Sequence, residues 1–377
     1  MSRIDELVAV LCPDGVEYRK LGDVANIRKG EQLNKNSLLA DGPYPVLNGG
    51  KDYSGYWTEF NSRSGVVAVS QGGASAGFVS WMAVPFWAGA HCYVVEETAS
   101  CEARYLFHVM KSCEIKFMQS QYGAGIPSLS AKSLAGTDVP VPPIEMQREI
   151  VRILDSFTEL EAELEAELGA RKAQYAYYRD RLLSLESLEA LDGKPVEMVR
   201  LGDVSRVLRG KRLTKKQLQE DGKFPVFHGG LSPIGFFSEK NRDAKCVMVI
   251  NVGASAGTVG YSDCDFWSSD GCYCLENSSR IAPRFLYAVL KSKEYEIRSK
   301  VRHAGIPTLD AKILECLEIP VPSLETQRKV VDILDRFDAL TTSLTDGIPA
   351  EIEARRSQYE YYRDRLLDFP HKGSVAV

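Results

Sequence analysis

One stretch of this sequence occurs twice, first as VEYRKLGDVANIRKGEQLNKNSLLADGPYPVLNGG (Val16–Gly50) and again 180 residues later as VEMVRLGDVSRVLRGKRLTKKQLQEDGKFPVFHGG (Val196–Gly230). An internal repeat of this length indicates a duplicated structural unit. The same offset relates further pairs of segments, among them the two GASAG loops (Gly73–Gly77 and Gly253–Gly257) and the segments AGIPSLSAK and AGIPTLDAK (Ala124–Lys132 and Ala304–Lys312).

Each copy has the pattern of a globular half followed by a long helix. Short β-branched runs such as SGVVAVS and KCVMVINV, separated by Gly and Asn clusters, predict a mixed α/β domain with a twisted sheet. The helix begins after a Pro-x-Pro stop, because proline fits the first turn of a helix but not its interior. We therefore expect an α/β (α+β) protein in four parts: domains at 1–143 and 191–323, and long helices at 144–190 and 324–377.

The first helix carries apolar residues at alternating spacings of three and four, with acidic residues between them. This seam is typical of a helix that pairs with another helix. About 42 residues at a rise of 1.5 Å give a length of roughly 63 Å, and the partner that we expect is the repeated helix. The seam consists of Ile150, Leu154, Phe157, Leu160, Leu164, Leu168, Tyr175, Tyr178, Leu182 and Leu185.

The second helix departs from the first at Asp346-Gly347-Ile348-Pro349. Glycine followed by proline within a helix predicts a break or kink, and here four residues have been inserted. The ends of the two helices, AQYAYYRDRLL and SQYEYYRDRLL, consequently pair at an offset of 184. We expect residues 345–350 to bulge or kink out, so that the seams match on both sides.

The composition is that of a folded intracellular protein. The chain has 377 residues, 44% of them hydrophobic and 26% charged, and it has no apolar run long enough to span a membrane. Nine cysteines without a secretion signal predict a reduced, cytoplasmic protein, and without any CxxC pair they do not predict a zinc site. The net charge of −5 is uneven, because residues 196–323 carry 19 Lys and Arg against 15 Asp and Glu.

The GASAG loop suggests two alternatives. Glycine lets backbone N–H groups approach a phosphate closely, which would make the loop a DNA contact. The other interpretation is a tight turn between two strands. No Lys-Ser or Lys-Thr pair follows, so it is not a nucleotide-binding P-loop. The candidate DNA-binding residues here are Gln71, Gly73, Ser75, Asn251, Gly253 and Ser255.

A basic cluster near the start of each copy is a second candidate for contact with phosphates. The two copies differ in charge here while they share their hydrophobic frame, as expected for two readers with different targets. A solvated surface, or neutral drift after duplication, is the alternative. The cluster consists of Arg209, Lys211, Arg212, Lys215 and Lys216 in the second copy and of Arg28, Lys29 and Lys35 in the first.

The YYRDRLL segments keep identical Arg and Asp residues at positions that a helix pair does not need. Such identity suggests a surface that does the same work twice; recent duplication would also leave it. The candidate docking residues are Tyr177, Arg179, Arg181, Tyr361, Arg363 and Arg365.

The sequence contains no convincing catalytic centre. Glu114-Ile115-Lys116 has the spacing of a nuclease motif, but its repeat mate is Glu294-Tyr295-Glu296. None of the five histidines is matched by a histidine in the other copy, and no Ser/His/Asp or Cys/His arrangement recurs. A nuclease or methyltransferase is therefore disfavoured, and no catalytic or metal-binding residue is predicted.

Taken in order, several motifs resemble the specificity subunits of type I restriction–modification systems. They are the opening IDELVAVLCPDGVEYRKLGDV, the repeated LGDV, the AGIP-[ST]-L segment, the helix start VPVPPIEMQREIVRIL and the helix end YYRDRLL. The resemblance implies two target-recognition domains separated by two long helices that pack as an antiparallel coiled coil, with the two repeats related by a pseudo-twofold. Each domain would read one half of a split DNA sequence in the major groove, and the helices would set the gap between the halves.

The same resemblance implies the partners. They are double-stranded DNA, two methyltransferase subunits, and nuclease/translocase subunits added for restriction. S-adenosylmethionine, ATP and magnesium would be bound by those subunits, and this chain would bind no cofactor of its own. The alternative function is a non-catalytic scaffold that binds protein partners through duplicated domains around a coiled coil; the mild acidity of the chain favours it slightly.

Overall fold

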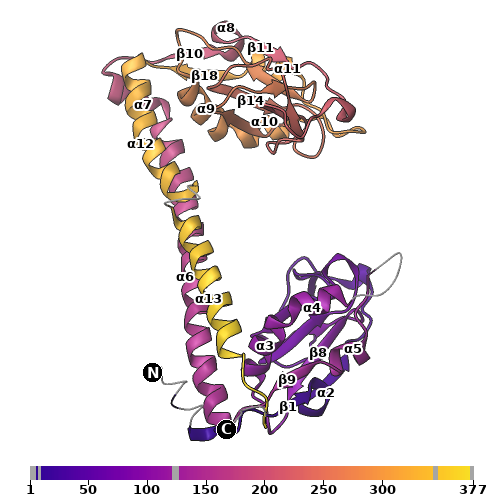
Figure 1. Ribbon diagram of the computed structural model, residues 1–377. Coiled ribbons are helices and arrows are strands. Elements are labelled where there is room, and N and C mark those ends of the chain that lie inside the picture. The colour runs from indigo at the N-terminus through magenta and orange to yellow at the C-terminus, as the bar shows by residue number, and fades with distance from the viewer. Residues whose placement is uncertain (1–5, 7–9, 121–126, 343–346, 374–377) are drawn as a thin grey trace. The chain divides into compact units, whose positions relative to one another are not determined.

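The computed structural model describes residues 6, 10–120, 127–342 and 347–373. The chain forms two compact units, drawn in Figure 1: unit 1 comprises residues 1–165 and 351–377, and unit 2 comprises residues 166–350. Each unit combines one α/β domain with parts of both helical regions. Helix α6 (Ile144–Leu182) begins in unit 1 and continues into unit 2.

The described residues of the α/β domain in unit 1 form three small sheets. The largest has the strand order β2-β8-β5-β6, and a second has the order β4-β3-β7. All strand pairs are antiparallel except β3 with β7. The strands are β1 (Tyr18–Lys20), β2 (Ala25–Lys29), β3 (Tyr44–Leu47), β4 (Gly55–Trp57), β5 (Val66–Ser70), β6 (Val79–Met82), β7 (Trp87–Ala88), β8 (Cys92–Glu97) and β9 (Asp138–Pro140), and the helices are α2 (Leu21–Val24), α3 (Ala103–Ser112), α4 (Glu114–Gln119) and α5 (Ala131–Ala135).

Strand β5 is buried along its whole length because both faces of its sheet are covered. Successive side chains of a strand point to opposite faces. Val67 and Val69 accordingly belong to a core that includes Leu106 of α3, whereas Val66 and Ala68 belong to a second core on the other face. A strand covered on both faces has a continuous apolar sequence, as SGVVAVS does, and not an alternating one.

Unit 2 repeats this architecture, with sheets in the orders β11-β17-β14-β15, β13-β12-β16 and β10-β18. The mixed α/β class that we expected for both copies is confirmed. The strands are β10 (Glu197–Arg200), β11 (Val207–Arg209), β12 (Phe224–Phe227), β13 (Gly235–Phe237), β14 (Cys246–Ile250), β15 (Val259–Ser262), β16 (Trp267–Ser268), β17 (Cys272–Leu275) and β18 (Glu318–Val321), and the helices are α8 (Leu201–Val204), α9 (Pro283–Ser292), α10 (Glu294–Ser299) and α11 (Ala311–Glu315).

Within unit 1, the first part of α6 pairs with α13 (Ile348–Leu366). The rings of Phe157 and Tyr362 stack with their centroids 5.3 Å apart, and Glu161 accepts from Arg356 at 2.7 Å. From Phe157 to Glu161 the residue number rises along α6, whereas from Tyr362 to Arg356 it falls along α13. The two helices are therefore antiparallel, as predicted. Figure 1 shows the two helices side by side.

Within unit 2, the second part of α6 pairs with α12 (Leu324–Thr342) in the same way. The rings of Tyr178 and Phe337 stack with centroids 6.1 Å apart, which is the repeat counterpart of the Tyr362–Phe157 pair. A short helix, α7 (Leu185–Asp192), follows α6, and Asp192 accepts hydrogen bonds from the hydroxyls of Ser323 and Thr326 at the start of α12.

The expected break in the second helix is present at Gly347, which is non-helical and directly precedes α13. Residues 343–346 lie outside the described residues, so the expected bulge at 345–350 falls partly there. The first helix is shorter than expected, with α6 ending at Leu182 after 39 residues. Its seam is also less continuous, since Leu160 is 42% exposed.

The end of the chain returns to its beginning in unit 1. Val16 N–H donates to the Pro370 carbonyl at 2.8 Å, and Lys372 N–H donates to the Val16 carbonyl at 3.0 Å. Gly15 has φ +90°, and a Cβ atom there would lie 2.6 Å from the carbonyl oxygen of His371. Only glycine permits this approach, so Gly15 allows the segment before β1 to pack against residues 370–372.

A buried histidine joins α3 of unit 1 to both helices. The His108 side chain is fully buried, with Nδ1 2.9 Å from the Tyr359 hydroxyl of α13 and Nε2 2.8 Å from Asp155 of α6. Arg104 also donates to Asp155, at 2.7 Å. Burial lowers the pKa of His108, although its hydrogen bond to Asp155 opposes the shift. The neutral ring therefore donates to the carboxylate and accepts from the tyrosine.

Candidate nucleic-acid interface

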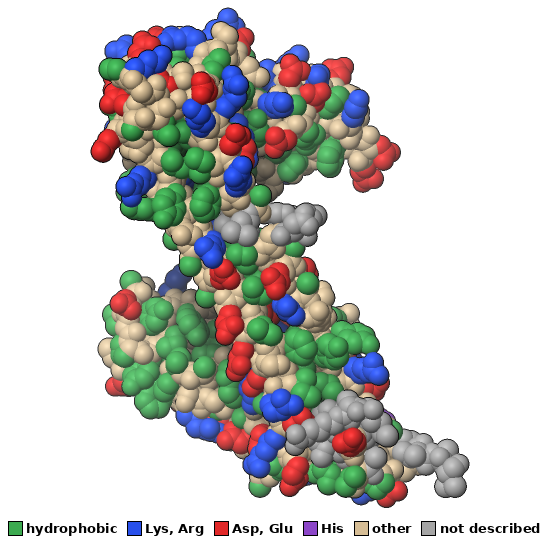
Figure 2. Space-filling view, turned by 90° about the vertical axis from the view of Figure 1, so that its left-hand side faces the viewer, with side chains coloured by type: hydrophobic (Ala, Val, Ile, Leu, Met, Phe, Trp, Pro, Cys, Tyr) green, Lys and Arg blue, Asp and Glu red, His purple; other side chains and the backbone are tan. Residues whose placement is uncertain are grey.

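The α/β domain of unit 2 contains a cavity of about 1000 Å³ with a basic rim. Most of its charged lining residues are Lys or Arg, and all of those are exposed at the surface. Figure 2 shows Lys and Arg side chains, mixed with acidic ones, over this domain (upper part of the view). The charged and titratable residues of the lining are Arg209, Arg212, Lys215, His228, Asp270, Tyr273, Lys300, Arg302 and Asp310.

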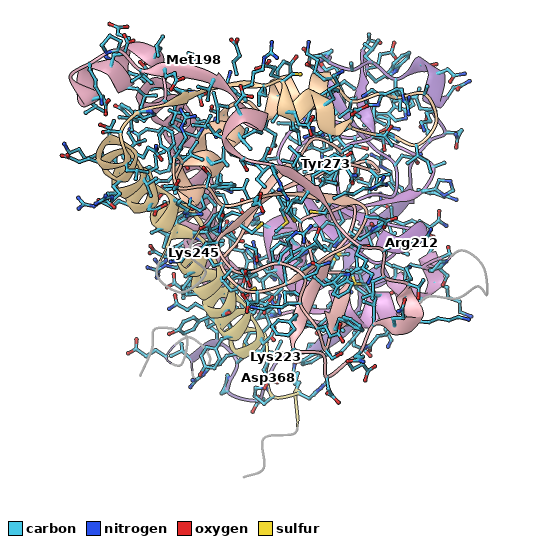
Figure 3. The ribbon with its side chains drawn as sticks, turned by 90° about the horizontal axis from the view of Figure 1, so that it is seen from above. Met198, Arg212, Lys223, Lys245, Tyr273 and Asp368 are labelled. Atoms are coloured by element: carbon cyan, nitrogen blue, oxygen red, sulfur yellow. The ribbon has the colours of Figure 1, made fainter. Side chains whose placement is uncertain are left out.

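The buried lining residues of the cavity, here called its floor, include Asn251, Tyr273 and Leu309, and two repeated motifs meet beside them. Gly253 of the GASAG loop donates its N–H to the carbonyl of Pro307 in the AGIPTL segment, at 2.9 Å. The hydroxyl of the buried Tyr273 donates to the carbonyl of Leu309, at 3.3 Å. Figure 3 labels Tyr273 inside the domain and Arg212 nearer its periphery. Lys and Arg side chains thus surround a floor whose position is fixed by hydrogen bonds to backbone carbonyls.

The GASAG loops are tight turns between strands. In unit 1 the turn joins β5 to β6, with Gly77 N–H donating to the Ser70 carbonyl at 2.8 Å. Gly73 has φ +77° and donates its N–H to Pro127, so this donor is already used within the chain. Gly77 has φ +90° and packs directly on the backbone of α4, where a Cβ atom would lie 2.8 Å from the Met118 nitrogen. These glycines have a structural reason to be there.

The structure brings together some of the candidates from the second copy and not others. Four predicted DNA contacts lie on the cavity, and Asn251 among them belongs to its floor. Lys211, Lys216, Gly253 and Ser255 are outside the lining. The four predicted contacts that are found in the lining of the cavity are Arg209, Arg212, Lys215 and Asn251.

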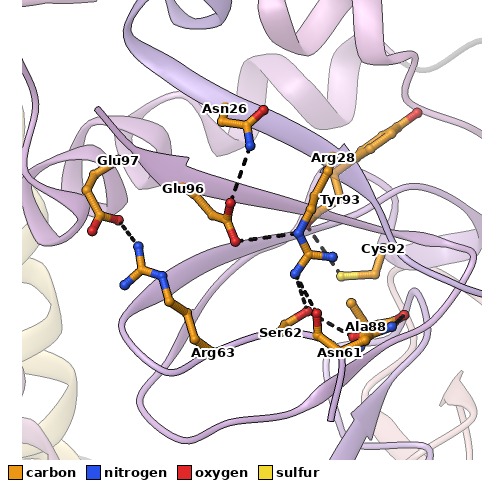
Figure 4. A network of polar contacts seen from close by, with 10 residues as sticks. All are labelled: Asn26, Arg28, Asn61, Ser62, Arg63, Ala88, Cys92, Tyr93, Glu96 and Glu97. Carbon is orange, nitrogen blue, oxygen red and sulfur yellow. Dashed lines mark hydrogen bonds and ion pairs between the residues drawn. The ribbon is translucent and has the colours of Figure 1, made fainter. Parts of the chain in front are cut away.

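In the first copy, Arg28 is held in a network of its own domain (Figure 4). Its guanidinium lies 3.4 Å from Glu96 and donates to the carbonyl of Asn61 and the hydroxyl of Ser62, at 2.9 and 2.7 Å. This arrangement favours a structural role for Arg28. Lys29 and Lys35 are exposed, on β2 and in the turn at Lys35–Ser37.

Sequence reasoning missed three basic residues of the rim: His228, Lys300 and Arg302. They lie outside the cluster at residues 209–216 in the sequence, and the fold brings them to the same cavity. One signal was present in the sequence, because Lys300 and Arg302 lie within four residues before the repeated AGIP segment. The motif Glu114-Ile115-Lys116 also has a structural explanation, since Glu114 accepts from the N–H of Val79 at 2.8 Å.

The YYRDRLL segments present matched arrangements in the two units. Tyr177 and Tyr361 are 59% and 58% exposed. The arginines Arg179 and Arg363 do not behave as surface residues, since their side chains are only 12% exposed. Each pairs with the following aspartate at 2.7 Å and lies over a tyrosine ring of its own helix, Tyr175 or Tyr359. Our expectation that these two arginines are off the packed face therefore needs correction.

Neither a metal site nor a membrane segment is found in the described part of the chain. No group of three or more His, Cys, Asp or Glu side chains is placed to hold a metal ion among those residues. No helix within them is both long enough and apolar enough to cross a bilayer. All nine cysteines are free thiols.

Two copies of one α/β frame, each with a different set of surface charges, define a modular binding protein. The chain belongs to the type I restriction modification DNA specificity family, whose domain matches residues 13–170 and 193–354. It is thus the non-catalytic specificity component of such a system, as the resemblance implied.

Proteins of similar sequence or fold match this chain over nearly its whole length. A Haemophilus influenzae protein named as a type I restriction enzyme specificity subunit is 30% identical, over 94% of this chain and 96% of its own length. The Escherichia coli EcoR124I/EcoR124II specificity subunit is 29% identical over all of both chains. The fold resembles that of the Mycoplasma genitalium type I S subunit, with a TM-score of 0.60 and 24% identity over 94% of this chain and 96% of that one.

Proposed function

We propose that this chain recognises a bipartite DNA sequence, with each α/β domain reading one half. The observation that carries this proposal is the difference between the two copies around the cavity. The frame residues are retained, whereas Arg212, His228 and Asp270 stand where the first copy has Gln32, Asn48 and Ala90. Different charged residues around a similar fold are what two different half-sites require.

The basic rim supplies the part of the affinity that does not depend on sequence. Lys and Arg side chains that neutralise phosphates release counterions, so binding weakens steeply as salt rises. Of the predicted contacts, Arg209, Arg212 and Lys215 have the best support because they surround one cavity with Lys300 and Arg302. In the first domain, Lys29, Lys35 and Gln71 are the corresponding candidates.

The helices set the spacing of the half-sites and dock two methyltransferase subunits. Each helix pair presents one copy of YYRDRLL, and the exposed tyrosines Tyr177 and Tyr361 are the natural anchors, since aromatic side chains dominate protein interfaces. Their neighbours Arg181 and Arg365 each donate to the tyrosine hydroxyl of the same helix, at 3.5 and 3.1 Å.

Catalysis in the assembled complex belongs to the partners. Methyltransferase subunits would bind S-adenosylmethionine, and nuclease/translocase subunits would bind ATP and magnesium, all in the cytoplasm where the DNA is. The purified chain, supplied with methyl donor, ATP and magnesium, is expected neither to methylate nor to cleave DNA. Turnover by the chain alone would contradict the proposal.

A domain exchange tests the division of labour. Residues 16–143 are replaced by the matching segment of a relative with a different target, and methylation by the assembled complex is mapped on a library of duplexes. We expect one half of the recognised sequence to change while the other half and the gap stay the same. A change in both halves would show that the domains do not read separately.

A further inference from the structure

One buried side chain on the floor of the cavity has an unused hydrogen-bonding group. Asn251 follows the last residue of β14 and is 5% exposed. Its backbone is held on both sides, because its N–H donates to Gly271 at 3.2 Å and its carbonyl accepts from Leu309 at 2.9 Å. The position of its side chain against the cavity is therefore determined by the fold.

The orientation of this amide is fixed as well. Nδ2 of Asn251 lies 3.2 Å from the backbone carbonyl oxygen of Asp270, which can only accept. The NH₂ group must face that oxygen, so Oδ1 points the other way. Oδ1 has no hydrogen-bond partner among the residues that the structure describes. An unpaired buried acceptor is costly, so its presence calls for an explanation.

The first copy has the same feature at the matching position, built from a different residue. Gln71 N–H donates to His91, and the Gln71 carbonyl accepts from Leu129, both at 2.8 Å. Nε2 of Gln71 donates to the Tyr93 hydroxyl at 3.0 Å, and that hydroxyl itself donates to Leu129. Oε1 has no partner within the described part of the chain. The side chain has changed length, but the amide and its unpaired oxygen have been kept.

We propose that Asn251 is a specificity-determining residue, whose Oδ1 accepts a hydrogen bond from the exocyclic amino group of an adenine or a cytosine in one half-site. In the major groove only these two bases present an amino donor, adenine at N6 and cytosine at N4. An amide whose NH₂ group is tied to the backbone can act there as an acceptor alone. Gln71 does the same for the other half-site. This inference rests on the proposed function.

The arrangement divides the work between rim and floor. Lys300 and Arg302, exposed at the rim, contact phosphates and position the duplex, while Asn251 below them distinguishes bases. Oδ1 is covered in the free chain, so the side chains that cover it must move aside as the DNA enters. The unpaired oxygen is then satisfied only by a base that carries the amino group, and a wrong base leaves it unpaired.

The test uses the chain assembled with its methyltransferase subunits and duplexes in which each position of the target is varied singly. Asn251→Ala is expected to weaken binding to the native target roughly ten- to hundredfold and to abolish discrimination at one adenine or cytosine of a single half-site. Discrimination in the other half-site stays as it was. Arg302→Ala is the matched control: it lowers affinity for all sequences alike and makes the salt dependence shallower by about one counterion.

Three results would overturn the inference about Asn251. A uniform loss with Asn251→Ala, like that with Arg302→Ala, would overturn the inference, and so would unchanged discrimination. Asn251→Gln, which introduces the residue of the first copy and keeps the amide, covers the case in which the alanine variant does not fold. It is expected to fold and to alter the preference at that one position; an unaltered preference overturns the inference. If the native complex recognises no bipartite target at all, the proposed function itself fails.

Discussion

At the scale of single residues, the two outer glycines of GASAG differ in what surrounds them. Gly73 and Gly77 both have positive φ, but nothing lies within 4 Å of a Cβ atom at Gly73, whereas α4 backbone occupies that place at Gly77. Gly73→Ala should therefore cost only the strain of the left-handed backbone, about 1–2 kcal/mol. Gly77→Ala should cost at least about 3 kcal/mol, because α4 must also move. Denaturant unfolding of both variants checks this, and equal losses would contradict it.

His108 makes the stability of unit 1 depend on pH. Burial lowers its pKa in the folded chain below the ordinary 6.5, so below pH 6.5 the unfolded chain binds more protons than the folded one. Stability contributed by the neutral ring is present above pH 6.5 and is lost as pH falls through the folded pKa. The melting temperature should fall more between pH 7.5 and 5.5 in the native chain than in His108→Gln, which can keep both hydrogen bonds.

The second copy lacks this histidine. The position that matches His108 in the second copy is Ala288, which lines a cavity of about 10 Å³ beside Tyr175 and Asp335. Equal pH dependence in the native chain and in His108→Gln would show that the buried ring does not titrate in this range.

At the scale of elements, the sequence predicted what has a local pattern. The apolar run SGVVAVS gave β5, and the Pro-x-Pro stop gave the first residue of α6. The parallel contact of β3 with β7 and the pairing of Val16 with the chain end could not be predicted, because they join distant segments with no pattern of their own. The floor residue Asn251 was proposed for its loop, but its unpaired oxygen required coordinates.

The helix ends should separate docking from stability. Tyr177→Ala combined with Tyr361→Ala removes two exposed rings, so binding to the methyltransferase subunit should weaken at least roughly tenfold while the melting temperature changes little. Arg363→Ala loses its contact with the Tyr359 ring and the pair with Asp364, so it should lower stability by about 1 kcal/mol. Pull-down and thermal melting of both variants give the answer. Full binding by the tyrosine variant would refute the docking role.

At the scale of the whole molecule, the helices are expected to determine the gap between half-sites. Base pairs are spaced about 3.4 Å along a strand, and four helical residues add about 6 Å, on the order of two base pairs. Four helix-forming residues inserted after Leu168, with Gly347→Ala and Pro349→Ala in the second helix, should lengthen the preferred gap. Binding to duplexes whose gap varies by single base pairs measures it. An unmoved optimum in a protein that folds and assembles would exclude the helices as the ruler.

The meeting of the chain's two ends has a consequence for gene architecture. Since Gly373 N–H donates to the Asp14 carbonyl at 3.0 Å, a short linker can join the tail to the segment before β1, and the chain can be opened between α12 and α13 instead. Such a circular permutant would encode α13 and the tail first, then the joined ends, the first domain, α6, the second domain and α12, with every contact within each unit retained. The two domains keep their order, but the point in the repeat at which the gene begins is then not determined by the contacts within the units.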